Sequence, residues 1–142
     1  MTRGAATSEP WPSLPLDAWS ETCAALHLWT QMVGKVRLAT SPRLNHSWHV
    51  TLYVTARGLT TSAMPHGART FQVDFDFVEH ELRILASDGA RGGFGLEAQP
   101  VSRFYGRLFG ELDALGLPVR ISRMPNELPN PVRFDRDDAP RP

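Results

Sequence analysis

Two runs of alternating apolar and polar residues, separated by a tight turn, constrain the fold of this chain most. Residues 71–78 carry an apolar side chain at every odd position, and residues 81–87 resume the alternation after a turn at Glu79-His80. Successive side chains of a strand point to opposite faces, so each run predicts a strand with one apolar face. Together the two runs predict an antiparallel hairpin.

The register of this hairpin is predicted by matching the two apolar faces. If Phe77 lies opposite Leu82, both strands keep their apolar side chains on one side of the sheet. Asp76 then lies directly across from Arg83, which is a favourable cross-strand pair. In this arrangement we expect Phe75 to be buried between the sheet and a helix.

Further strands are predicted on either side of the hairpin. Residues 48–57 have apolar side chains at the even positions, which is typical of a strand with one buried face. The glycine-rich residues 92–96 predict at most a short edge strand. Residues 119–121 are short and apolar enough to add a last strand.

Two amphipathic helices are predicted. Apolar residues recur at intervals of three and four over residues 16–36, which indicates a helix of about five turns. The same spacing covers residues 101–115, and Gly116 is the expected C-terminal cap of that helix. An antiparallel sheet of three to five strands with both helices packed on one face satisfies this order, so the sequence predicts an α+β fold.

The sequence predicts one folded unit with loosely attached ends. Residues 1–13 have little to bury and are expected to be disordered. Residues 14–123 form the predicted α+β domain. Prolines and charges interrupt residues 124–142, which we expect to be a tail or linker outside the core.

Charge and composition narrow the classes of partner. Fifteen basic residues balance fifteen acidic ones, so no net charge draws the chain to nucleic acid or to an anionic membrane. The N-terminus has no apolar segment of the kind that signal peptides carry, and no run approaches the length of a membrane span. We therefore expect a cytoplasmic protein that binds neither nucleic acid nor membrane.

The polar face of the predicted sheet is the first candidate site. Imidazole, phenol, guanidinium and carboxylate groups on one face supply donors and acceptors for a polar ligand. The alternative is that this face is simply solvated, as one face of an antiparallel sheet normally is. The ligand-binding candidates on this face and in the loop before it are His46, His49, Tyr53, Arg57, Asp74 and Asp76.

Catalysis and metal binding have weaker support in the sequence. The His46-x-x-His49 spacing suits zinc, but it straddles a loop and a strand, so backbone hydrogen bonding is the default interpretation and no metal is predicted. No P-loop and no nucleophile elbow is present. An enzyme, hydrolytic or metal-dependent, that uses His46, His49, Tyr53 and Asp74 remains the alternative to a binding domain. The cofactor is unknown.

Four segments together resemble a known bacterial family. They are LHLWTQMVGKVRLA, SWHVTLYVTARGLTTS, FQVDFDFVEHELRI and FYGRLFGELDALG, and the likeness to domain of unknown function 5996 (DUF5996) runs from about Leu14 to Phe134. The resemblance implies no reaction, so no catalytic residue is carried over from it.

The resemblance also implies something about length. Members of the family are expected to be about twice as long, so this chain is similar to their N-terminal half only. We expect either a single-repeat version or a truncated product. A homodimer that replaces the missing half is the simplest closed assembly, with Trp11, Trp29 and Trp48 as its anchors.

These observations favour a binding or interaction domain. Its polar sheet face is expected to bind a small ligand or a partner, and the sequence names neither.

Overall fold

The fold is described from a computed structural model in which residues 11–41 and 51–141 are defined. The elements in chain order are η1 (Leu16–Ala18), α1 (Ser20–Thr40), β1 (Tyr53–Val54), β2 (Gly58–Thr60), β3 (Met64–His66), β4 (Arg69–Asp76), β5 (Glu81–Ala86), β6 (Arg91–Gly95), α2 (Val101–Ala114) and η3 (Phe134–Arg136). No helix in the defined part of the chain is long and apolar enough to cross a membrane.

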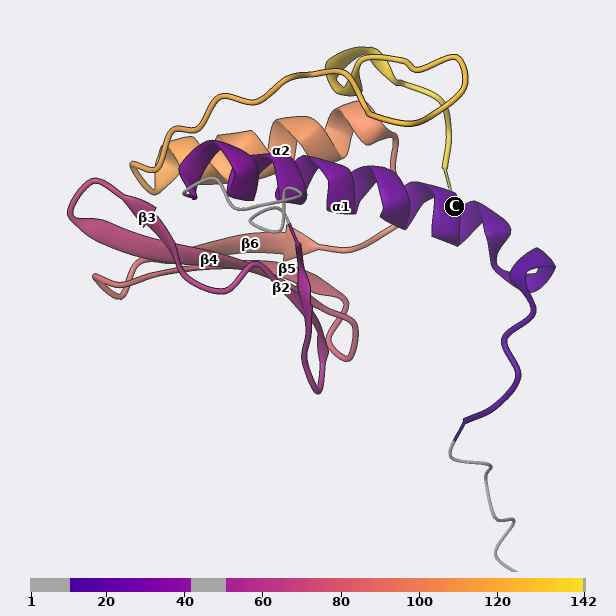
Figure 1. Cartoon of the computed structure of the whole chain (residues 1–142), viewed down its shortest axis with the longest axis horizontal. Coiled ribbons are helices and arrows are strands. Elements are labelled where there is room, and N and C mark those ends of the chain that lie inside the picture. The colour runs from indigo at the N-terminus through magenta and orange to yellow at the C-terminus, as the bar shows by residue number, and fades with distance from the viewer. Residues whose placement is uncertain (1–10, 42–50, 142) are drawn as a thin grey trace, which may run out of the picture.

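The strands form one antiparallel sheet with both helices on the same side. The sheet runs in the order β1-β2-β4-β5-β6, and β3 pairs with a further part of β4. Helices α1 and α2 lie over one face (Figure 1). The α+β prediction is confirmed. The sheet has six strands rather than three to five, because β2 and β3 were not predicted as separate strands.

The hairpin of β4 and β5 forms, but with a register two residues away from the predicted one. Phe75 lies opposite Leu82, and Asp76 lies opposite Glu81 instead of Arg83. Strand β4 ends at Asp76, so the connection is a four-residue turn rather than a two-residue one. A shift of two residues leaves every side chain on its own face, so alternation alone does not detect it.

The predicted strand at residues 48–57 is wrong over the part that the structure describes. Only Tyr53 and Val54 are in a strand, and Val54 is 85% exposed instead of buried. The chain turns directly afterwards, because the Thr55 hydroxyl accepts the backbone N–H groups of Arg57 and Gly58 at 3.2 and 3.0 Å. Residues 42–50 lie outside the described part of the chain.

The core lies between the sheet and the helices. Phe75 is 1% exposed, which confirms the prediction that it packs under a helix. Its ring is parallel to that of Phe104 of α2, which in turn stacks on Trp29 of α1 with the ring centroids 4.8 Å apart.

Because Trp29 is buried here, it does not serve as a dimer anchor. Trp48 lies outside the described residues, and the homodimer itself stays a prediction.

The C-terminal segment belongs to the core, so the expectation of a tail outside it is wrong. Phe134 is fully buried, and η3 packs on α2. The backbone N–H of Ser102, in the first turn of α2, donates to the carbonyl of Asp137 at 3.0 Å. In Figure 1 this segment returns across the helices.

Residues 119–121 form no strand. The disorder expected for residues 1–13 falls mostly outside the described part of the chain.

Candidate functional site

The side of the sheet away from the helices carries most of the predicted site residues that the structure describes. We call it the outer face. Strand pairing places Thr60 opposite Asp74, and Asp74 opposite Arg83. No element among the described residues covers this face (Figure 1). Its polar residues on β2, β4 and β5 are Thr60, Thr70, Gln72, Asp74, Asp76, Glu81 and Arg83.

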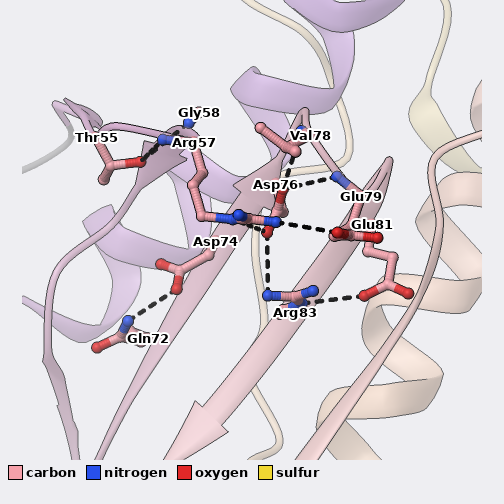
Figure 2. A network of polar contacts seen from close by, with 10 residues as sticks. All are labelled: Thr55, Arg57, Gly58, Gln72, Asp74, Asp76, Val78, Glu79, Glu81 and Arg83. Atoms are coloured by element: carbon pink, nitrogen blue, oxygen red, sulfur yellow. Dashed lines mark hydrogen bonds and ion pairs between the residues drawn. The ribbon is translucent and has the colours of Figure 1, made fainter.

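Asp76 is the centre of a network of polar contacts on this face (Figure 2). Its side chain is 4% exposed. Its Oδ2 accepts a hydrogen bond from Arg57 Nε at 2.7 Å and forms an ion pair with Arg83 Nη1 at 3.0 Å. Its Oδ1 accepts the backbone N–H groups of Val78 and Glu79, both at 2.9 Å. The hydrogen bond from Arg57, helped by these turn N–H groups, lowers the pKa of Asp76 from 3.8 to about 2. Asp76 is therefore an ionised carboxylate with three hydrogen-bond donors and a second guanidinium group in ion-pair contact.

The two guanidinium groups also bind carboxylates at the rim of the face. Arg57 Nη2 lies 3.4 Å from Glu79 Oε1, and Arg83 Nε lies 3.0 Å from Glu81 Oε2. The network joins the turn after β1 to both strands of the β4–β5 hairpin. The predicted contact between Asp76 and Arg83 is present as a diagonal pair. The contact with Arg57, which is stronger in geometry, was not predicted.

Asp74 has a different environment from Asp76. Thr60 Oγ1 donates to one of its oxygens, and Gln72 Nε2 donates to the other at 2.9 Å. Neither partner is charged, and no cation among the described residues is ion-paired with Asp74. Asp74 lines a shallow hollow of about 310 Å³ together with Thr60, Gln72, Arg57, Arg83 and the turn residues Thr55 and Ala56.

Tyr53 does not join this network, so the expectation that it shares one strand and one face with Arg57 is wrong. Its hydroxyl lies 3.3 Å from Nη2 of Arg37, a buried residue of α1, and the Arg37 guanidinium lies 5.0 Å from the centre of the Tyr53 ring. Arg37 also donates to the carbonyl of Thr61 and to the hydroxyl of Ser62. Arg37 thus joins α1 both to β1, through Tyr53, and to the start of the β2–β3 connection.

Four residues were proposed for the alternative, an enzyme. The two that the structure describes, Tyr53 and Asp74, are not brought together. His46 and His49 lie outside the described residues. The Tyr53 hydroxyl contacts Arg37, whereas Asp74 contacts Thr60 and Gln72. Within residues 11–41 and 51–141, no group of three or more histidine, cysteine or acidic side chains is placed to hold a metal ion.

A second region was missed as a site by the sequence analysis. His27, Gln31 and Lys35 of α1 lie one turn apart on the same side of the helix and face Asn126 of the C-terminal segment. They line a groove of about 610 Å³, which we call the α1 groove. The four-residue spacing of these side chains was visible in the sequence, but Asn126 lies 91 residues from Lys35.

Comparison with known proteins places the chain in a family but gives it no activity. No curated protein and no solved structure matches it. A family model matches residues 11–142, which extends slightly beyond the limits expected from the resemblance. The part of the chain that contains the outer face, the α1 groove and the buried C-terminal segment lies inside this match. The chain therefore belongs to the family of unknown function DUF5996.

Proposed function

We propose that the protein is a binding module whose outer face takes a small polar ligand with a cationic group. The observation that carries the proposal is the contrast among the acidic residues of this face. Asp76, Glu79 and Glu81 are each ion-paired with an arginine, whereas among the described residues Asp74 accepts hydrogen bonds only from neutral groups. Asp74 is thus the one carboxylate of this group with charge left for a ligand.

The neighbours of Asp74 favour binding through its carboxylate. Thr60 and Gln72 each use one donor, which fixes the plane of the carboxylate and leaves lone pairs on both oxygens. An ammonium or amidinium group accepted there forms a charge-assisted hydrogen bond, which is stronger than one between neutral groups. The hollow around Asp74 has a volume of about 310 Å³, which is at the lower end of small-molecule sites.

The same neighbours favour binding over proton transfer. The groups that line the hollow with Asp74 include hydroxyl, amide and guanidinium groups, which serve as hydrogen-bond donors. Asp76, the second carboxylate, has a pKa of about 2 and stays ionised. General acid–base catalysis works best when a group has a pKa near the working pH. The arrangement therefore suits a site that holds a ligand.

The proposal is tested with a pair of probes that differ in charge. Benzamidine carries a planar cation that matches a carboxylate, and benzamide is its neutral near-isostere. In an NMR titration, we expect benzamidine to shift the backbone amide signals of β2 and β4 in a saturable way, with an affinity on the order of millimolar for so small a ligand. Benzamide should not do so.

Two variants with equal changes in charge locate the site. Asp74→Asn should abolish the response to benzamidine, because it removes the charge but keeps an oxygen for the Thr60 hydroxyl. Asp113→Asn, at an exposed position near the end of α2, should respond like the parent protein. Equal benzamidine binding by the Asp74→Asn variant, or an equal response to benzamide, would contradict the proposal.

A further inference from the structure

The α1 groove lies on a different part of the molecule from the outer face and differs from it in chemistry. One end is polar, with His27, Thr30, Gln31 and Lys35 on the helix and Asn126 opposite. The other end is apolar. Its apolar side chains are Leu38 of α1, Leu52 before β1 and Leu59 of β2. We infer that this groove binds a small molecule that combines a single carboxylate with an apolar body.

Lys35 is the residue that selects an anion. It is the only lysine in the chain, and its Nζ donates to Asn126 Oδ1 at 3.3 Å. None of the ion pairs formed by the described residues includes Lys35. Partial burial lowers the pKa of Lys35, because removing an ammonium group from water disfavours its charged form. A ligand carboxylate would supply the missing counter-charge.

The polar end is held in place before any ligand arrives. Gln31 binds the backbone of Asn126 twice, because its Nε2 donates to the Asn126 carbonyl at 3.0 Å and its Oε1 accepts the Asn126 N–H at 2.8 Å. The His27 ring lies 3.2 Å from the same Nε2. These contacts fix the side of the groove opposite α1, so less conformational entropy is lost when a ligand binds.

The charge around the groove favours one negative charge on the ligand over two. Glu127 also lines the groove, and it forms no ion pair with Lys35. A dianionic phosphate would bring two negative charges to one ammonium beside this carboxylate. A monocarboxylate brings a single negative charge, which the ammonium of Lys35 balances. A single carboxylate is therefore the anionic group that we infer for a ligand of the α1 groove.

The apolar end fits the body of such a ligand. Leu38 is 46% exposed, and Leu52 and Leu59 are half-buried, so all three leucines retain apolar surface at the groove. Leu38 follows Lys35 by one helical turn, so a ligand whose carboxylate meets Lys35 lays its apolar body along these leucines. The volume of about 610 Å³ lies within the range of small-molecule sites.

The experiment compares octanoate with octanamide, which has the same chain and no charge. By isothermal titration calorimetry at neutral pH, the parent protein should bind octanoate more tightly than octanamide. Lys35→Met keeps the length of the side chain and removes its charge, so it should weaken octanoate binding by roughly tenfold or more and leave octanamide binding unchanged. Lys35→Arg should retain most of the octanoate affinity, because the positive charge remains.

A matched control removes a cation elsewhere. Arg120→Met, at an exposed position after α2, should bind octanoate like the parent. Thermal unfolding of each variant should show that it folds. Three results would overturn the inference: no octanoate binding by the parent, equal binding of octanoate and octanamide, or full affinity in a folded Lys35→Met variant. Equal losses in Lys35→Met and Arg120→Met would also overturn it, because the effect would then come from overall charge.

Discussion

The outer face and the α1 groove each contain a charged group that is partly removed from water. The group on the outer face has partners of opposite charge, whereas the group in the groove has a neutral partner. Asp76 accepts hydrogen bonds from Arg57 and from two backbone N–H groups, and it also forms an ion pair with Arg83. In the part of the chain that the structure describes, the ammonium of Lys35 has one neutral partner, the Asn126 side chain. A charge that is fully paired supports the fold around it, whereas a charge without a counter-charge keeps its capacity for a ligand.

Two arginines, Arg57 and Arg37, have the same supporting role in the fold as Asp76. Arg37 and Arg57 lie in two of the four segments that resemble the family, and both bind other parts of the fold. Arg57 binds Asp76 across the outer face, and Arg37 binds Tyr53 and the β2–β3 connection. These polar residues hold segments together, so an unusual density of polar side chains in a sequence does not by itself indicate a ligand site.

The largest expected effect tests whether the outer face depends on the core beneath it. Phe75 is 1% exposed and stands between Asp74 and Asp76 on β4. Phe75→Ala leaves a cavity under the network and should cost about 3–5 kcal/mol of unfolding free energy. Denaturant unfolding measures it, with the exposed Val78→Ala as control. A loss no larger than that of the control would show that the network is held without the core.

A smaller effect is expected when the network loses its central charge. Asp76→Asn leaves Arg57 and Arg83 without their shared carboxylate, so its free energy of unfolding should fall below that of the parent but by less than for Phe75→Ala. Asp113→Asn is the control and should stay within about 0.5 kcal/mol of the parent. If the two variants are equally stable, the ion pairs of the outer face contribute nothing measurable and the comparison fails.

Acid should remove the same contribution gradually. The pKa of Asp76 is lowered in the folded state from 3.8 to about 2, so its stabilising contribution is present above the unfolded value and is lost as the pH falls towards the folded one. We expect the difference in Tm between the parent and Asp76→Asn to be constant near neutral pH and to shrink between about pH 4 and pH 2. A difference that is unchanged down to pH 2 would rule out Asp76 ionisation as its cause.

The parts of the fold that were predicted correctly depend on local periodicity. The faces of the β4–β5 hairpin follow from alternation, and α2 follows from its apolar spacing and from Gly116, whose φ is +69°. The hairpin register was wrong, because a two-residue shift preserves the faces and Asp76 starts the turn by accepting the N–H groups of Val78 and Glu79.

The parts that were missed depend on contacts between distant segments. Phe134 is a single aromatic residue among prolines, and no periodicity indicates that it is buried against α2. The candidate site was predicted only in part for the same reason. Asp74 and Asp76 share a face as expected, but their different partners come from the β1–β2 turn and from side chains across the sheet. The role of Asn126 opposite Lys35 has no local signal at all.

The central claim is that the paired charge of Asp76 supports the fold and that the charge of Lys35 does not. It is tested most directly by comparing denaturant unfolding of Asp76→Asn and Lys35→Met, each against the parent, at neutral pH and without ligand. Asp76→Asn should be clearly less stable than the parent. Lys35→Met should be as stable as the parent or more stable, because burial already disfavours its ammonium. A Lys35→Met variant that loses as much stability as Asp76→Asn would contradict the account.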